Sequence, residues 1–232
     1  MSQKFTSRLS VSDRQNLLNK SQQCLWLDEG KPGLDYLIQT RKLSPEVVRL
    51  FGLGYVPHDV KHPLAGRIVF PLYDPSGNLI VLTTRHIAVN KTFLPIYWHE
   101  QYEKSFYVYG CNIAKQYIRQ QGWGILVEGQ FDVMQLHNHG ITNVVGLCGT
   151  ALSSVQLYTI RRYANEVVVL LDCDVNEAGQ RASEKILKTT YGHKVVSVML
   201  PIGVDPDDLV KKYGTSKLIR VMNEKLNELR AE

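Results

Sequence analysis

The pattern of hydrophobic and polar positions changes near residue 121. After this point, short runs of consecutive apolar residues alternate with longer stretches whose apolar residues recur at helical spacing. Such short, continuous runs are typical of strands that are covered on both faces in a parallel sheet. We expect strands at 125–127, 144–146, 167–171 and 195–199, and helices near 131–139, from 153, at 178–190 and from 207. The alternation predicts a mostly parallel sheet with helices on both faces.

The first half of the chain has a mixed pattern. Leucines at helical spacing predict a helix within 1–30, and two short helices are expected after it. The second of these begins where Ser44 supplies an N-cap and Pro45 the first helical position, and it ends at Gly52. A strand or loop is expected at 53–56.

Two β-rich runs around the turn residues 74–78 predict a hairpin. Arg67 and Arg85 fall at the outer ends of its strands, so strand pairing is expected to bring them near each other. Lys91 and Lys104 follow, interleaved with aromatic residues. Cations among aromatic side chains suit a surface that binds single-stranded nucleic acid. The alternative, a half-buried aromatic cluster under a solvated charged face, is favoured by this pattern alone.

The fold class expected from these patterns is α/β, with an α+β N-terminal subdomain followed by a domain with a mostly parallel sheet. The domain boundary is expected near residue 121. The segments are an N-terminal helical extension at 1–30, a basic subdomain at 31–121, the parallel α/β domain at 122–214 and a C-terminal helix at 215–232.

Composition narrows the class of protein. The chain has 232 residues, of which 44% are apolar and 21% charged, as in ordinary globular proteins. No apolar run approaches the roughly 20 residues of a membrane span, and the first residues lack the apolar core of a signal peptide, so we expect an intracellular protein without a membrane partner. The four cysteines are scattered without a Cys-x-x-Cys pair, which predicts reduced thiols and no zinc site.

The formal net charge is +5, and the excess of basic residues lies in the first half of the chain. Acidic residues instead follow the predicted parallel strands: Glu128 follows the first, Asp172 and Asp174 the third, and Asp205 and Asp207 the fourth. The carboxyl ends of parallel strands meet at one edge of a sheet, where several carboxylates repel one another unless a cation neutralises them. We therefore expect a magnesium site, although each acid alone is also a common helix cap.

Gly149 and Thr150 follow the second predicted strand, and their backbone N–H groups could bind a phosphate. A simple turn explains this pair equally well.

Taken in order, these motifs resemble those of bacterial-type DNA primases, whose Toprim domain corresponds here to 122–214. The motifs that carry the resemblance are Glu128-Gly-Gln-Phe-Asp132, Gly149-Thr150, Asp172-Cys-Asp174 and Asp205-Pro-Asp207, and upstream Tyr36-Leu37 to Leu43-Ser44, Phe51 to Pro57, Gly66 to Pro71 and Phe106 to Gly110. The matching stretches run from about residue 36 to residue 214 in the expected order, which is more specific than any single motif.

The resemblance implies a catalytic core that makes short RNA primers on single-stranded DNA from ribonucleoside triphosphates, with Mg²⁺ or Mn²⁺ as the metal. The implied catalytic residues are Glu128, Asp172 and Asp174. The implied metal ligands are Glu128, Asp132, Asp172, Asp174, Asp205 and Asp207. The implied nucleic-acid- or nucleotide-binding residues are Arg67, Arg85, Lys91, Lys104, Gly149 and Thr150.

The sequence also departs from the family pattern. It contains no stretch like the family's zinc-binding or helicase-binding domains, so we expect a replicative helicase or a separate zinc-binding protein as partner. The Asn-Ser pair usual after Leu94 is missing, and Tyr73 stands where a cation is common. An origin in a phage or mobile element, and a place in the cytoplasm of a bacterial or phage-infected cell, fit this minimal form. The alternatives are a primase-like accessory protein that binds single strands or nucleotides, and a Toprim nuclease or topoisomerase-like enzyme.

Overall fold

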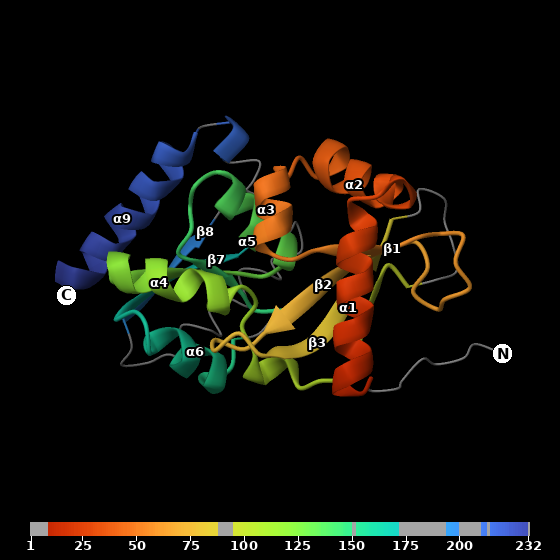
Figure 1. Ribbon diagram of the computed structural model, residues 1–232. Coiled ribbons are helices and arrows are strands. Elements are labelled where there is room, and N and C mark those ends of the chain that lie inside the picture. Colours follow the sequence, from red (N-terminus) through yellow and green to blue (C-terminus); the bar gives the residue numbers. More distant parts are fainter. Residues whose placement is uncertain are drawn as a thin grey trace. The chain divides into compact units, whose positions relative to one another are not determined.

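The computed structural model describes residues 9–87, 95–149, 152–171, 194–199, 210–212 and 214–231. The chain forms two compact units (Figure 1). The first comprises Met1–Tyr73 and Gly77–Tyr102, and the second comprises Asp74–Ser76 and Glu103–Glu232. The helix expected at 178–190 lies outside the described residues, as do the predicted site residues Lys91, Thr150, Asp172, Asp174, Asp205 and Asp207.

The first unit contains an antiparallel sheet in the order β1-β2-β3-β4. Its strands are β1 (Gly54–Val56), β2 (Arg67–Tyr73), β3 (Leu79–His86) and β4 (Tyr97–His99). β2 and β3 form the predicted hairpin. In the turn, the Ser76 N–H donates to Asp74 Oδ1 at 2.8 Å, and Gly77 adopts a φ of 95° that an L side chain disfavours.

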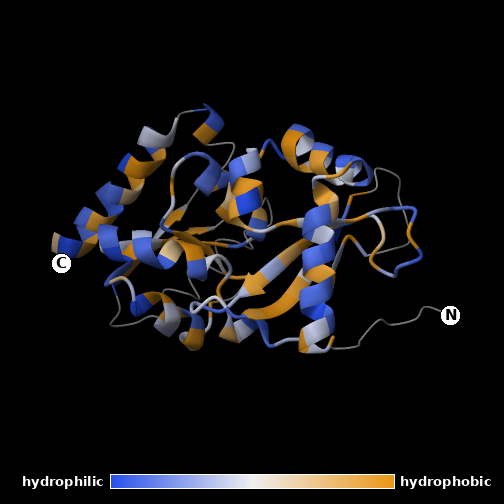
Figure 2. Ribbon diagram, viewed as in Figure 1, coloured by the Kyte–Doolittle hydropathy of each residue, from blue (hydrophilic) through white to orange (hydrophobic). Residues whose placement is uncertain are grey.

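Helices cover this sheet. They are α1 (Val11–Leu25), the short turns η1 (Asp28–Gly30), α2 (Lys31–Asp35) and η2 (Tyr36–Thr40), and α3 (Pro45–Leu50). The side chain of Ser44 accepts a hydrogen bond from the Val47 N–H, which confirms the predicted N-cap of α3. Leu18 of α1 is buried with Val69 and Leu82 of the sheet, whereas the face of α1 that is visible in Figure 2 is mainly hydrophilic. The predicted N-terminal helix is thus an amphipathic cover for the sheet.

Lys42 carries a backbone strain that the sequence did not indicate. Its φ is 58°, in the left-handed region, two residues after η2 ends at Thr40. The neighbouring residues hold it there, because the Arg41 N–H donates to Tyr36 O at 2.9 Å and the Leu43 N–H to Leu37 O at 3.0 Å. A side chain in this conformation costs about 1 kcal/mol or more, and glycine does not have this cost.

We therefore expect Lys42→Gly to raise the free energy of unfolding by about 1 kcal/mol, measured by urea denaturation. Lys42→Ala is the matched control, since it removes the same side chain and keeps the strain. Equal stabilities of the Gly and Ala variants would contradict the assignment of strain to this position.

The second unit contains a parallel sheet in the order β6-β5-β7-β8. Its strands are β5 (Trp123–Val127), β6 (Val144–Gly146), β7 (Glu166–Leu171) and β8 (Lys194–Met199), and its described helices include α4 (Cys111–Gln121), α5 (Gln130–Asn138), α6 (Ser154–Arg161) and α9 (Thr215–Ala231). A 3-10 turn, η3 (Lys104–Phe106), precedes them. The expected alternation of parallel strands and helices is confirmed in these residues.

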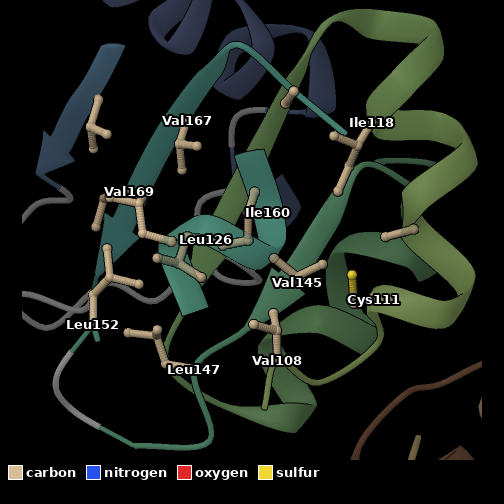
Figure 3. Close-up of a cluster of buried hydrophobic side chains, with 14 residues drawn as sticks. Val108, Cys111, Ile118, Leu126, Val145, Leu147, Leu152, Ile160, Val167 and Val169 are labelled. Carbon is tan, nitrogen blue, oxygen red and sulfur yellow. The ribbon is translucent and has the colours of Figure 1, made fainter. Parts of the chain in front are cut away.

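Both faces of the parallel sheet are buried. On one face, sheet residues such as Leu126 and Val169 pack against α4 and α6 (Figure 3). Cys111 of α4 belongs to this core, and burial raises the pKa of its thiol to about 11. The alternate residues of the strands, such as Ile125 and Val168, are fully buried as well, and pleating turns them to the opposite face. The sheet is therefore the middle of three layers.

The start of the second unit differs from the expected boundary. Its main segment begins at Glu103, whereas the pattern change suggested a division near residue 121. The reason is α4, whose buried residues, including Cys111 and Ile118, complete the core on one face of the parallel sheet.

Among the described residues, no helix is both long and apolar enough to cross a membrane.

Candidate functional site

The strand order places a topological switch point between β5 and β7. From β5 the chain continues to β6 on one side of β5, and it then returns to β7 on the other side. In open α/β sheets, ligands bind in the crevice at the carboxyl ends of such a strand pair. Glu128 directly follows β5, and β7 ends at Leu171, immediately before Asp172 in the sequence. The parallel pairing of Leu126 with Val169 sets these two strand ends at the same edge of the sheet.

The turn that carries Glu128 has a defined local structure. Gly129 is the N-cap of α5, and its N–H donates to Asp132 Oδ2 at 2.8 Å. A Cβ atom on Gly129 would lie 2.8 Å from the same oxygen, so a larger residue at this position would displace the Asp132 carboxylate. Glu128 itself is half-buried. Asp132 therefore acts as a helix cap that fixes the turn. Its metal-binding role stays a prediction. The capping bond does not exclude that role, because a carboxylate has two oxygens.

The loop after β6 lies at the same edge. The Leu147 N–H donates to Val127 O at 2.9 Å, which holds the start of this loop against the end of β5. Cys148 then adopts a φ of 57°, a strained conformation that the sequence did not indicate. Gly149 is exposed, and a Cβ atom added to it would meet no atom of the described residues within 4 Å. The space beside Gly149 is therefore open to a ligand, and phosphate binding stays a prediction because the partner Thr150 lies outside the described residues.

Gln156 ties this loop to the segment that carries Lys104. Its side chain is buried, and the two N–H groups of Nε2 are shared among three backbone oxygens, at 3.1 Å from Lys104, 2.8 Å from Tyr107 and 2.9 Å from Leu147. Ser153 reinforces this link, because its hydroxyl donates to Ser105 O. The Ser-x-x-Gln capping box of α6 is visible in the sequence, but its long-range bonds are not.

We expect Gln156→Leu to lower the free energy of unfolding by about 2 kcal/mol or more, because buried carbonyl groups lose their donor. Gln116→Leu, at an exposed position of α4, is the matched control and is expected to change the stability by less than about 0.5 kcal/mol. Urea unfolding of both variants checks the difference. Similar midpoints would mean that water replaces the Gln156 amide without cost.

The predicted basic residues differ strongly in exposure. Arg67 is buried, and its guanidinium donates to the backbone oxygens of Ile96 at 3.1 Å and Pro95 at 2.7 Å. Burial lowers the pKa of Arg67 from its ordinary value. Arg67 pairs with His86 across the hairpin, next to Arg85, so pleating turns the two arginines to opposite faces of the sheet. Hence Arg67 anchors the chain at residues 95–96, and a direct contact with nucleic acid stays a prediction.

Arg85 lies in a group of aromatic and basic side chains. Its Nε donates to the Tyr36 hydroxyl at 2.8 Å, and its guanidinium also donates to the Tyr97 hydroxyl. The guanidinium carbon lies 4.8 Å from the centroid of the Tyr97 ring. Arg41 donates from Nε to the same Tyr36 oxygen at 2.9 Å. Sequence reasoning selected Arg85, but it gave no binding role to Arg41 and used Tyr36 only as part of a motif; both lie far from the hairpin in sequence.

Lys104 begins η3 and is exposed, as is the nearby Phe106. These two exposed side chains are compatible with the predicted surface of cations and aromatic rings. Lys91 lies outside the described residues.

Within the part of the chain that the structure describes, no three His, Cys, Asp or Glu residues form a group that could hold a metal ion. Four of the six predicted ligands are outside that part, as stated above. The donor set nevertheless suits a hard cation, since Glu128 at the switch point and the acidic residues that follow β7 in sequence supply only oxygen ligands. Divalent metal binding at this edge stays a prediction.

Comparison with known proteins supports the α/β fold class that the sequence predicts. Residues 125–210 match the Toprim-like family model. The chain is 32% identical over 221 residues to the DNA primase of Aquifex aeolicus, covering 80% of this chain and 44% of the relative. It spans less than half the length of the curated relatives that it matches.

Solved structures give the same result. The zinc-binding and RNA polymerase domains of the Aquifex aeolicus primase are similar with a TM-score of 0.75 and 28% identity, over 94% of this chain and 62% of that one. A DnaG primase catalytic domain bound to single-stranded DNA is similar with a TM-score of 0.79 and 25% identity, over 94% and 82% of the two chains. The predicted resemblance to the catalytic core of bacterial-type primases and the predicted α/β fold class are both confirmed.

Proposed function

We propose that this chain is a DNA primase catalytic core that synthesises short RNA primers on single-stranded DNA by metal-dependent nucleotidyl transfer. The observation that carries the proposal is the position of Glu128 at the switch point between β5 and β7, in a chain similar to primase catalytic domains over most of its length. In this reaction the 3′-hydroxyl of the primer attacks the α-phosphorus of a ribonucleoside triphosphate, and pyrophosphate leaves.

Different residues are assigned to proton transfer, metal binding and phosphate binding in this reaction. Glu128 accepts or directs the proton of the attacking hydroxyl, and Asp172 and Asp174 act with it in catalysis. Asp132, Asp205 and Asp207 complete the proposed Mg²⁺ or Mn²⁺ ligands. When bound, the metal would stabilise negative charge on the triphosphate and lower the pKa of the hydroxyl. The backbone of Gly149 and Thr150 is proposed to bind phosphate, because the loop after β6 begins at the same edge as Glu128.

The proposed partners are the single-stranded template, ribonucleoside triphosphates, and a replicative helicase or separate zinc-binding protein in the cytoplasm of a bacterial or phage-infected cell. A relative's solved structure is of a catalytic domain bound to single-stranded DNA, which supports the first of these. Arg85, Lys91 and Lys104 would bind template or nucleotide. Arg67 would contribute mainly by anchoring residues 95–96 through its two backbone hydrogen bonds.

A second candidate function is a single-strand-binding accessory protein that makes no primers. It is favoured by the cations and aromatic rings of the first unit, which suit binding without synthesis. A Toprim nuclease is less well supported, since the similarity to primases includes the first unit as well.

The test is a synthesis assay with labelled ribonucleotides on single-stranded DNA, with Mg²⁺ or Mn²⁺, for the chain alone and with helicase or zinc-domain proteins added. We expect products of primer length that disappear with a metal chelator. Strand binding without product under all these conditions would reject the enzyme and leave the accessory protein.

A further inference from the structure

Two arginines of the first unit share a single hydrogen-bond acceptor. Arg41 follows the η2 turn and Arg85 lies on β3, and each donates its Nε–H to the hydroxyl oxygen of Tyr36, at 2.9 and 2.8 Å. A phenol oxygen can accept two such bonds. The shared acceptor therefore fixes two positively charged groups side by side.

This proximity has an electrostatic cost. Two unit charges about 4 Å apart repel by roughly 1 kcal/mol in water, and by more where the site is partly desolvated. All three side chains are half-buried, so solvent screens the repulsion only in part. An anion that contacts both guanidinium groups removes this cost, and a phosphate oxygen is the acceptor whose geometry the planar guanidinium fits best.

The neighbouring ring indicates which phosphate fits. Tyr97 pairs with Arg85 across β3 and β4, its ring lies 4.8 Å from the guanidinium carbon of Arg85, and 51% of Tyr97 is exposed. Exposed rings beside phosphate-binding cations are the arrangement by which proteins hold single strands, because bases stack on the rings while cations bind the backbone.

We propose that Arg41 and Arg85, aligned by the Tyr36 hydroxyl, together bind one backbone phosphate of a single strand. This inference rests on the proposed function for its choice of ligand. It adds Arg41 as a binding residue and Tyr36 as a positioning residue to those indicated by the sequence.

The test is fluorescence anisotropy of a labelled single-stranded oligonucleotide at several salt concentrations, without metal or nucleotides. Each lost phosphate contact lowers the slope of log K against log salt by about 0.7 for single strands. Because the remaining arginine still contacts the shared phosphate in each single variant, we expect Arg41→Ala and Arg85→Ala to weaken strand binding with little change of slope, and the double variant to lower the slope by about 0.7. Arg41→Lys should keep most of the slope while weakening binding, since it keeps the charge and loses the fork of donors.

Tyr36→Phe tests the alignment, because it removes only the hydroxyl. We expect it to weaken strand binding several-fold in the wild-type background and to have no further effect in the Arg41→Ala/Arg85→Ala variant. Arg49→Ala is the matched control: this exposed arginine also stacks on an aromatic ring, with its guanidinium carbon 4.0 Å from the centroid of Trp26, but among the described residues no shared acceptor pairs it with a second arginine. Its slope and affinity are expected to remain those of the wild type. Urea midpoints establish that each variant is folded.

Three results would overturn the inference. An unchanged strand affinity in Arg41→Ala would exclude Arg41, and a double variant whose slope falls by about 1.4, twice the value for one contact, would indicate two separate phosphates. If Arg41→Ala instead weakens the binding of ATP and leaves strand binding intact, the phosphate belongs to a nucleoside triphosphate. None of these measurements needs primer synthesis, so a failed synthesis assay and a failed binding test remain distinguishable.

Discussion

The primer synthesis proposed for this chain is expected to fall on the order of 100- to 10,000-fold when Glu128 is replaced by Gln, because a positioned acid or base contributes that much to a proton transfer. The amide is nearly the same size as the carboxylate, so the turn between β5 and α5 should keep its structure. The bond from the Gly129 N–H to Asp132, which fixes this turn, does not involve the side chain of Glu128. The loss should therefore appear in the rate of synthesis and not in strand affinity.

Glu224→Gln provides the matched control. Glu224 lies on α9 with 63% of its side chain exposed, and its contact with Arg220 is 3.7 Å long. The same change of charge there should leave synthesis unaffected. Full synthesis by Glu128→Gln would remove Glu128 from the catalytic centre, even if the chain proves to be a primase.

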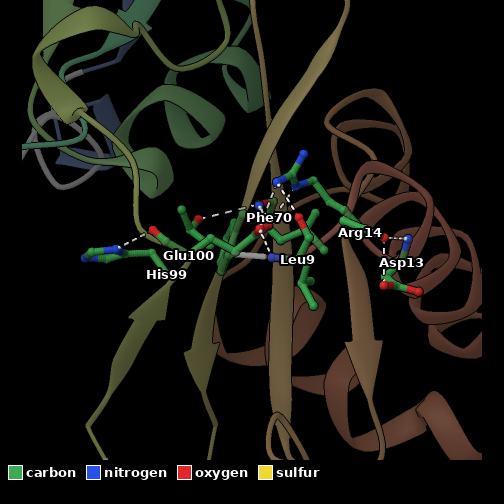
Figure 4. A network of polar contacts seen from close by, with 9 residues as sticks. Leu9, Asp13, Arg14, Phe70, His99 and Glu100 are labelled. Atoms are coloured by element: carbon green, nitrogen blue, oxygen red, sulfur yellow. Dashed lines mark hydrogen bonds and ion pairs between the residues drawn. The ribbon is translucent and has the colours of Figure 1, made fainter. Parts of the chain in front are cut away.

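The second large effect concerns stability and the carboxylate of Glu100. It accepts hydrogen bonds from Arg14 Nε at 2.8 Å and Nη2 at 2.9 Å, and from the backbone N–H groups of Leu82 and Leu9 (Figure 4). Only 6% of the Arg14 side chain and none of the Glu100 side chain are exposed. These hydrogen bonds of Glu100 hold α1 and the residues before it against the sheet.

Arg14→Met is expected to lower the free energy of unfolding by about 3–5 kcal/mol, because it leaves a buried carboxylate without its counter-ion. Lys225→Met is the matched control: the Lys225–Glu228 contact is 2.7 Å long, but 47% and 62% of these side chains are exposed. Solvent screening limits its contribution to about 0–1 kcal/mol. Denaturant unfolding of the two variants compares ion pairs of nearly equal length. Equal losses of unfolding free energy in the two variants would show that burial does not strengthen the Arg14–Glu100 ion pair.

Local patterns in the sequence predicted most of the described elements. The apolar runs marked all four parallel strands, and Ser44 and Ser153 marked the starts of α3 and α6, because strand burial and helix capping depend on residues close in sequence. Glu128 could be selected for the same reason, since it stands directly after a buried run.

Roles that depend on distant contacts could not be predicted in this way. Arg67 and Arg85 look alike in the sequence, but the register of the hairpin gives one a buried position and the other a half-buried one beside Tyr97. Gln156 and Arg41 were missed because the contacts that give them a role span 49 residues, from Gln156 to Tyr107 in one case and from Tyr36 to Arg85 in the other. The sequence around Gln156 indicates only the start of a helix, and the sequence around Arg41 only the end of one. Neither indicates which distant groups these two side chains contact.

The lengths of the strands in the first sheet have a consequence for association between molecules. Its edge strands β1 and β4 have three residues each, while the central β2 and β3 have seven and eight. In the second unit, Tyr109 pairs with Gly146 at the end of β6 through hydrogen bonds of 2.8 and 3.0 Å. Short or covered edges offer few backbone groups to a strand from another chain, which is how natural sheets avoid fibrous aggregation. The first sheet can thus be expected to resist edge-to-edge pairing with a strand of another molecule.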